Sequence, residues 1–230
     1  MKPNLWIVGD SYVMPNMKTK QWIDHTKGWP YLLGNSLDVD TTSVIGQYGC
    51  ANTYICYEIK KNSIHMKPND YLVVVTTSYI RQWFFFEHPH YTSIKTQFDQ
   101  KLISRQQHKA LEQYSIYLDS NDENKTIDLE NMIAWCHIFA QRKNLRLAII
   151  PCFEWNHLHT CLDGSLYNID LHEHGGSDKK QKWLDDNNKQ DTKDCHLSPE
   201  NHIILTQRLT DFFTHNKEID LSNGFVKDLF

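Results

Sequence analysis

The chain has 230 residues, of which 40% are hydrophobic, 12% aromatic and 23% charged, a globular composition at a length that buries most of the apolar surface. Its 24 Lys and Arg against 28 Asp and Glu give a net charge of -4, which disfavours a binder of nucleic-acid phosphates because such proteins need a basic face. No stretch approaches the ~18 consecutive apolar residues of a membrane-spanning helix.

The N-terminal segment MKPNLWIVGDS does not resemble a signal peptide, because its apolar run stops at Asp10 without a small-residue cleavage site. In a chain of this length without such a signal, cysteines are expected as free thiols rather than a disulfide framework. The chain has 6 of them: Cys50, Cys56, Cys136, Cys152, Cys161 and Cys195. We therefore expect a cytoplasmic protein with no membrane or nucleic-acid partner, and leave its oligomeric state open.

The first third of the chain alternates strand and helix patterns. Apolar residues 5–8 end at Gly9-Asp10-Ser11, which predicts a buried strand followed by a turn. Helical spacing predicts a helix over residues 29–37, with Pro30 suited to its first turn. β-branched residues predict a second strand over 41–45, and apolar spacing predicts a second helix over 52–61.

The strongest strand pattern is residues 71–75, which are apolar without alternation, as expected for a strand covered on both faces of a parallel sheet. Helical patterns follow over residues 93–118 and 127–143, and another apolar strand over 145–150. A polar region over about 152–194, with a short strand predicted at 166–171, interrupts the alternation.

A final amphipathic helix is predicted through Phe213, with Ser198 as its N-cap and Pro199 in its first position. Residues 216–230 are expected to form a tail. We expect one domain over residues 1–230, because strands alternate with helices throughout, which favours a parallel sheet with helices on both faces. Ligands bind beyond the carboxyl ends of the strands in such sheets, so the loops after the strands are the place to look for a site.

Those loops carry the residues of a hydrolytic site. Gly9-Asp10-Ser11 near the N-terminus, Gly49 in the second loop and Asp194-Cys195-His196 near the C-terminus resemble the SGNH hydrolases, also called GDSL esterases/lipases, over roughly residues 4–214. The resemblance implies a flavodoxin-like three-layer α/β/α sandwich with a mostly parallel sheet of strand order 2-1-3-4. It also implies Ser11 as nucleophile, His196 as its base and a backbone N–H of Gly49 in the oxyanion hole.

The third loop departs from the family pattern. Members usually have Gly-x-Asn-Asp there, with the Asn side chain completing the oxyanion hole, whereas this chain has Thr76-Thr77-Ser78-Tyr79, so that Ser78 falls where Asn is expected. Loss of one such donor costs about 10²–10³ in turnover. The hole could use the backbone N–H groups of Ser11 and Gly49, helped by Ser78, Asn52 or Arg81. An ordinary loop serine and a plain turn glycine are the alternatives for Ser78 and Gly49. A helix N-cap after the first strand is the alternative for Ser11, and a surface histidine before the last helix is the alternative for His196.

The last block also differs from the family pattern. In the usual Asp-x-x-His the carboxylate lies three residues before the histidine, and here that position is Lys193. Asp194 lies two residues before His196 and Asp191 lies five before it. We assign Asp194 to orient the imidazole, with Asp191 as the alternative.

Two further segments are candidates for substrate or metal binding. In the aromatic run of residues 81–89, Arg81 and Trp83 suit a substrate's anionic group and an acyl or sugar pocket, with a packing loop and a surface ion pair as alternatives. Trp155 could serve as a second aromatic platform. Nearby residues of zinc-ligand type match no standard zinc module in their spacing, so no metal is expected. They are Cys152, His157, His159, Cys161, His172 and His174.

We therefore expect a serine-dependent ester hydrolase that needs no cofactor and forms an acyl-enzyme on Ser11, with a small acyl group such as acetyl, on a carbohydrate, as the favoured substrate. A non-catalytic protein of the same fold, carbohydrate-binding or virion-type structural, is the alternative; the absent Asn favours it, and Ser11 with His196 opposes it. A flavin- or nucleotide-binding module is disfavoured, because no Gly-rich phosphate loop is present.

Overall fold

The computed structural model describes residues 2–10, 13, 28–47, 50–77, 104–119, 122–151 and 199–216. Its helices and strands are β1 Leu5–Gly9, α1 Trp29–Ser36, β2 Thr42–Gly46, α2 Asn52–Asn62, β3 Tyr71–Thr76, α4 Arg105–Asp119, α5 Asp122–Lys143, β4 Arg146–Pro151 and α8 Pro199–His215. The strands and helices expected at these places are thus confirmed.

The largest difference from the expected bounds concerns α4, which begins at Arg105, whereas one helix was expected over residues 93–118. Ser104 caps α4, because its hydroxyl accepts from the N–H of Gln107 and the Gln107 side chain accepts from the N–H of Ser104. The next difference concerns α5, which begins at Asp122 rather than near residue 127, and whose first residues, Asp-Glu-Asn-Lys-Thr, carry no apolar spacing. Periodicity alone therefore places this helix start too late.

The four strands form one parallel sheet in the order β2-β1-β3-β4. This confirms the expected strand order and the parallel sheet. All four strands point the same way, so the sheet has one edge where the strands begin and one where they end. We call these the amino edge and the carboxyl edge.

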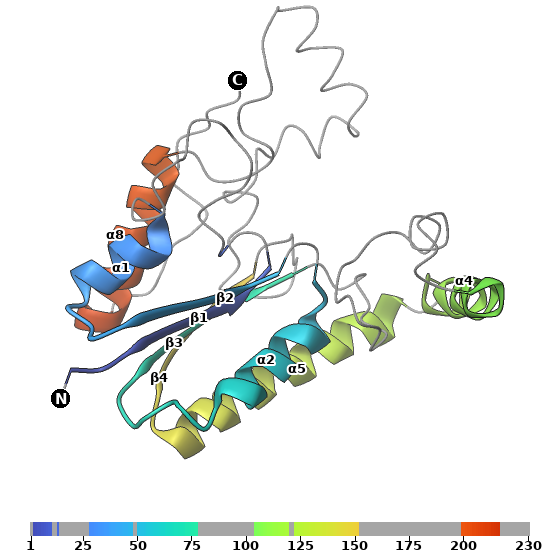
Figure 1. Cartoon of the computed structure of the whole chain (residues 1–230), viewed down its shortest axis with the longest axis horizontal. Helices are drawn as coiled ribbons and strands as arrows, with labels where there is room; N and C mark the ends of the chain where they lie inside the picture. The colour runs from blue at the N-terminus through green and yellow to red at the C-terminus, as the bar shows by residue number, and fades with distance from the viewer. Residues whose placement is uncertain are drawn as a thin grey trace, which may run out of the picture.

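Helices cover both faces of the sheet, which makes the molecule a three-layer α/β/α sandwich (Figure 1). On one face, α1 and α8 pack against strand residues that include Leu5, Ile7 and Val73. On the other face, α2 and α5 pack against Trp6, Val8 and their neighbours on β3. α4 lies apart from the sheet, next to the start of α5 (Figure 1).

Burial of β3 follows from this layering. All six of its residues are buried, because one helix pair covers each face and β1 and β4 cover its two sides. A strand in that position has no solvated face, which is why its sequence lacks polar alternation.

Close packing of α1 on the sheet depends on Gly34. A Cβ at this position would collide with the hydroxyl of Thr42 on β2. Glycine therefore lets the helix approach the edge strand more closely than any larger residue would allow.

None of the described helices is long and apolar enough to cross a membrane. The expected polar region of residues 152–194, its short strand and all of the tail beyond residue 216 lie outside the described residues.

Candidate functional site

The carboxyl edge brings three loop starts together. Gly9 at the end of β1 is in register with Gly46 at the end of β2 and with Val75 on β3. The three neighbouring strands therefore end within one or two residues of each other in register. Residues that follow these strands closely in sequence start from adjacent points in space.

Asp10 lies just after β1 and is completely buried, with 0% of its surface exposed. The Thr77 hydroxyl, also at 0% exposure, donates a hydrogen bond to the Asp10 carboxylate at 3.0 Å. A buried carboxylate is costly unless hydrogen bonds compensate for its lost hydration. This pair therefore ties the loop after β1 to the loop after β3.

Asn52, the first residue of α2, connects the second loop to the third. Its side-chain Nδ2 donates to the carbonyl oxygen of Thr77 at 3.0 Å, and its Oδ1 accepts from the backbone N–H of Thr77 at 2.8 Å. Both backbone groups of one residue are thus satisfied by one amide side chain. The two bonds hold the chain at Thr77 at a set distance from the start of α2.

Gly9 is crowded by its neighbours at the same edge. A Cβ there would lie 2.7 Å from Val75 Cβ, 2.8 Å from the Val75 carbonyl oxygen and 2.7 Å from a Val13 methyl carbon. The backbone N–H of Gln47 and the Cys50 thiol both donate to the Gly9 carbonyl, at 3.3 and 3.6 Å. Only glycine fits at this last position of β1, before Asp10.

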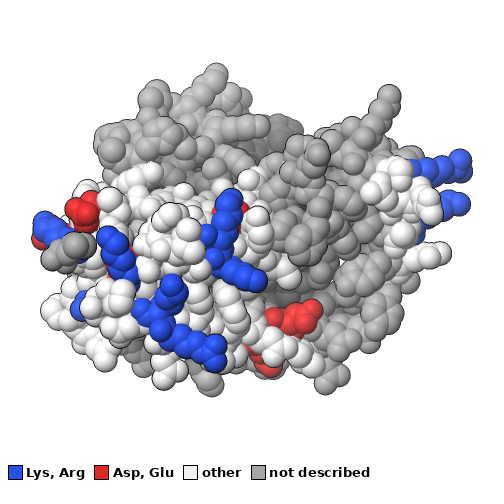
Figure 2. Space-filling view, turned by 60° about the horizontal axis from the view of Figure 1, so that its bottom comes forward, with Lys and Arg blue, Asp and Glu red and all other residues white. Residues whose placement is uncertain are grey.

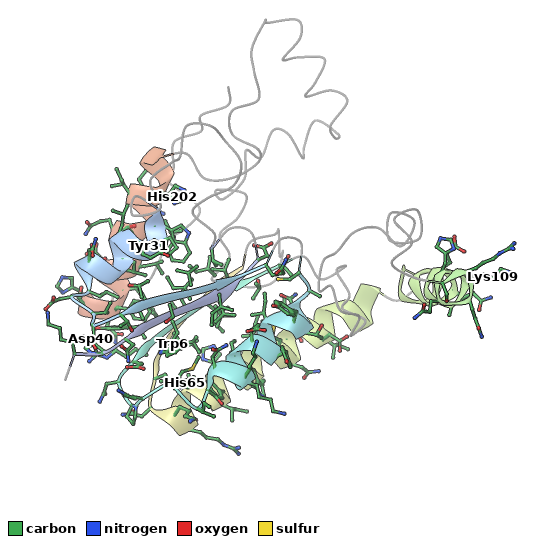
Figure 3. The ribbon with its side chains drawn as sticks, in the orientation of Figure 1. Trp6, Tyr31, Asp40, His65, Lys109 and His202 are labelled. Atoms are coloured by element: carbon green, nitrogen blue, oxygen red, sulfur yellow. The ribbon has the colours of Figure 1, made fainter. Side chains whose placement is uncertain are left out.

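The start of α8 is fastened to the start of α1. The backbone N–H of Trp29 donates to Nδ1 of His202 at 3.1 Å, and the Thr206 hydroxyl contacts the Trp29 carbonyl oxygen at 3.4 Å. Gly28 gives α1 no side-chain cap, so the imidazole takes over that role from another helix. This requires Nδ1 to be unprotonated. Figure 3 shows His202 on α8 beside α1.

That contact also places the last helix relative to the sheet. The α1 helix ends near the amino edge, where the N–H of Asp40 donates to the Pro3 carbonyl at 2.8 Å, so it begins towards the carboxyl edge. Since α8 begins beside it at Pro199, the first residue of α8 also lies towards the carboxyl edge.

Of the site residues expected from the sequence, Asn52 is the one that the structure describes. Ser11, Gly49, Ser78, Arg81, Trp83, Trp155, Asp191, Asp194 and His196 lie outside the described residues. The structure describes residues that are next to some of them in sequence. Ser11 follows the buried Asp10, Ser78 follows the clamped Thr77, and His196 precedes α8 by three residues.

Sequence reasoning did not single out the roles of Thr77 and His202. Thr77 sits in a run of small polar loop residues with nothing to set it apart. His202 and Thr206 are four residues apart, which puts them on one face of the helix, but the same spacing occurs by chance on many helices. Both roles depend on partners far away in the chain.

The described cysteines, Cys50, Cys56 and Cys136, are free thiols, as expected. Cys56 on α2 and Cys136 on α5 are hydrogen-bonded to each other, which lowers the pKa of Cys56 and, together with burial, raises that of Cys136. Both belong to the core between these helices and the sheet, which makes them packing residues.

Within the described ranges, no group of three or more His, Cys, Asp or Glu is arranged to hold a metal ion. The Cys152–His174 cluster weighed as a zinc site lies outside these ranges.

No family model and no curated protein matches the chain. Among solved structures, it is similar to a G-D-S-L family lipolytic protein from Desulfitobacterium hafniense, with a TM-score of 0.40 and 10% identity over 90% of this chain and 97% of that one. A member of the same lipolytic family from Veillonella parvula gives 0.36 and 12%, over 93% and 98%.

A carbohydrate esterase family 2 enzyme with a carbohydrate-binding domain, from Corynascus thermopiles (Myceliophthora fergusii), gives a TM-score of 0.38 and 11% identity over 94% of this chain and 66% of that one. At these identities the likenesses assign no role to any residue.

Proposed function

We propose that this chain is a serine esterase of SGNH type that hydrolyses a small acyl ester, such as an acetyl group on a carbohydrate. Ser11 attacks the ester carbonyl, and His196 takes its proton and returns it to the leaving alcohol. Asp194 orients the imidazole, with Asp191 as the alternative carboxylate. Water then attacks the acyl-enzyme with His196 again acting as base, which releases the acid and restores Ser11.

The observation that supports the proposal is that β1, β2 and β3 end together at the carboxyl edge and that α8 begins beside the start of α1. The loops that bear Ser11, Gly49 and Ser78 leave three adjacent strands whose ends are in register. The segment that bears His196 leads into α8, whose start is fastened to α1 by His202. A nucleophile, a base and oxyanion donors from distant parts of the sequence would all approach one place.

The oxyanion hole in this proposal consists of the backbone N–H groups of Ser11 and Gly49, with Ser78 as a third donor. Asn52 was a further candidate donor. Its amide is bonded to both backbone groups of Thr77, so we assign it chiefly to positioning the third loop. In this proposal, the two bonds to Thr77 position the chain next to Ser78 and so offset part of the loss of the usual third-block Asn.

Substrate contacts are assigned to Arg81, Trp83 and Trp155. The two indole rings suit the faces of a sugar, and the guanidinium suits an anionic group on the substrate.

The experiment is hydrolysis of p-nitrophenyl acetate by the full chain and by Ser11→Ala and His196→Ala. Because nucleophile and base act as a unit, each variant should lose at least ~10³-fold in kcat/KM, and the double variant should lose little more. Ser63→Ala and His215→Ala replace the same residue types away from the carboxyl edge and should keep full activity.

A fluorophosphonate probe separates this function from the non-catalytic alternative. The esterase should form one covalent adduct, located on Ser11 by peptide mass spectrometry and absent in His196→Ala. A protein that binds glycans but shows neither hydrolysis nor labelling would instead be the non-catalytic binding protein. Activity that survives in Ser11→Ala but disappears in Cys50→Ala or Cys195→Ala would assign a thiol nucleophile.

A further inference from the structure

The amino edge of the sheet, opposite the candidate site, carries a cluster of cationic side chains around the ends of α2 and α5. Figure 2 brings this end of the molecule forward and shows Lys and Arg gathered on it. We define the amino-edge patch as Lys60, Lys61, His65, Lys67, Arg142 and Lys143, together with Ile64.

Hydrogen bonds between its segments hold the patch together. The Lys143 ammonium group, at the end of α5, donates to the Ser63 carbonyl oxygen at the end of α2 at 3.0 Å. The N–H of Asn69 donates to the Asn144 carbonyl oxygen at 2.7 Å, which joins the two turns that follow these helices. The cations therefore belong to one preformed surface, although more than 70 residues separate the two halves in sequence.

The acidic side chains within residues 58–70 and 141–146 are Glu58 and Asp70, against six Lys and Arg. The Glu58 side chain is 7% exposed and pairs with Lys61 at 3.3 Å. Asp70 is 1% exposed and accepts hydrogen bonds from groups inside the molecule, including Trp6. The solvent-facing side chains of these two segments are therefore strongly cationic, in a chain whose net charge is -4. The exposed acidic residues Asp38 and Asp40 lie near the same edge, after α1, and Asp38 is paired with Lys2.

Helix dipoles account for only part of this charge. Lys60, Lys61, Arg142 and Lys143 lie in the last turns of α2 and α5, where cations are favoured by the negative end of the dipole. Lys67 lies outside both helices. Arg146, at the start of β4, lies on the other face of the sheet, where its guanidinium group donates to the Tyr71 hydroxyl at 2.9 Å and Tyr71 packs against Phe213 of α8, so it is not part of the patch.

Ile64 indicates which anionic partner fits. It is 78% exposed in the turn after α2, next to the exposed His65 and within a few residues of three lysines. Figure 3 shows His65 at this end of the molecule. An aliphatic side chain among flexible lysines suits a lipid interface, where it enters the headgroup region while the ammonium groups stay at the phosphates. Single-stranded nucleic acid instead favours large stacking platforms such as Phe, Tyr and Trp, and none of the patch residues is one of these.

We propose that the amino-edge patch docks this protein on an anionic lipid surface, with Ile64 inserted at the headgroup level. The carboxyl edge then points away from the lipid, because the two edges lie at opposite ends of the sheet. This inference is independent of the proposed esterase activity. It replaces the expectation of no membrane partner, which was drawn from the total charge and from the lack of a spanning segment.

The test is co-sedimentation of the full chain with vesicles of phosphatidylcholine alone or mixed with phosphatidylserine. Binding should require phosphatidylserine and weaken as salt is raised, because the attraction is screened over about 10 Å at ordinary ionic strength. Lys60→Gln with Lys67→Gln should lower the affinity about 30-fold, at roughly fivefold per cation removed. The matched control is Arg105→Gln with Lys109→Gln on α4, which removes the same charge elsewhere and should leave binding within about twofold.

Ile64→Ser tests the apolar contact at constant charge. It should weaken binding to phosphatidylserine vesicles and make the remaining binding more sensitive to salt. The variant removes an exposed side chain, so thermal unfolding should be unchanged. Equal binding to neutral vesicles, no binding at all, or equal losses in the patch and control variants would each overturn the proposal. Tighter binding to a DNA oligonucleotide than to vesicles of equal phosphate content would also overturn it, in favour of a nucleic-acid partner.

Discussion

Each edge of the sheet holds a buried aspartate, and the two serve different purposes. Asp70 precedes β3 at the amino edge with 1% exposure, and Asp10 follows β1 at the carboxyl edge with 0%. Asp70 accepts hydrogen bonds from the backbone N–H of Asn4 at 2.8 Å, from Trp6 Nε1 at 3.0 Å and from the backbone N–H of Lys67 at 3.0 Å. Asp10 is reached by the hydroxyl of Thr77, from a loop that the proposed mechanism uses.

The electrostatics of Asp70 fit a structural role. Burial acts to raise its pKa, but the hydrogen bonds from Asn4, Lys67 and Trp6 outweigh burial and hold the pKa below its ordinary value. The carboxylate is thus kept ionised to join the starts of β1 and β3. At the amino edge, a buried carboxylate stabilises the sheet; at the carboxyl edge, the buried Asp10 side chain joins the ends of two strands through its bond to Thr77. The comparison teaches that burial of an ionisable group does not by itself mark a catalytic site.

The largest expected effect tests the structural role of Asp70. Asp70→Ala leaves four donors, among them the Asn4 side-chain amide, without their acceptor, which should lower the free energy of unfolding by about 3 kcal/mol. The activity of the molecules that remain folded should not change, because the edge is remote from Ser11. Urea unfolding and esterase assays on the same samples measure both quantities. Asp38→Ala, which removes an exposed ion pair with Lys2, is the control and should cost under about 0.5 kcal/mol.

A large fall in activity per folded Asp70→Ala molecule would break the comparison, since it would mean that the two edges are coupled.

Compared with Asp70→Ala, a substitution of Asn52 should have a smaller effect on stability and a larger effect on activity. Asn52→Ala removes both bonds to the backbone of Thr77 and should cost about 1–2 kcal/mol in unfolding free energy. The third loop would lose its fixed position, so kcat should fall about 10- to 100-fold with little change in KM. Steady-state kinetics with p-nitrophenyl acetate measure this split.

Asn62→Ala supplies the matched control at the other end of the same helix. Its side chain also bonds a backbone carbonyl, that of Glu58 at 2.8 Å, but at the amino edge. Its loss should cost about 1 kcal/mol or less and leave kcat unchanged. Equal kinetic losses in the two variants would contradict the positioning role of Asn52.

The smallest effect is the pH dependence that Asp70 contributes. Its folded-state pKa is depressed, so between the folded pKa and the ordinary value of about 3.9 the unfolded chain binds more protons. The stabilisation is therefore complete above the unfolded pKa and is lost as pH falls through the folded pKa. Urea unfolding measured below about pH 5 should show a shallower acid decline in Asp70→Asn than in the unmodified chain. An unchanged decline would assign the acid sensitivity to other carboxylates.

Local pattern predicted most of the fold. The unbroken apolar run of residues 71–75 indicated a strand covered on both faces, and β3 is buried along its whole length. Pro30 and Pro199 indicated the starts of α1 and α8 correctly. The starts of α4 and α5 were placed too early and too late, because a capping pair, Ser104 with Gln107, begins α4 and the first residues of α5 carry no apolar spacing.

The sequence by itself determined which segments are strands and helices and, from their alternation, that the sheet is parallel, because those properties depend on neighbours within one or two turns. Contacts between distant segments were decided only by the tertiary structure. The register of β1 against β2 and β3 brings Asn52 to Thr77, and the packing of α8 on α1 brings His202 to Trp29. The amino-edge patch is likewise assembled from the ends of two helices, and a net charge summed over the chain hides it, since electrostatic attraction depends on where charges lie.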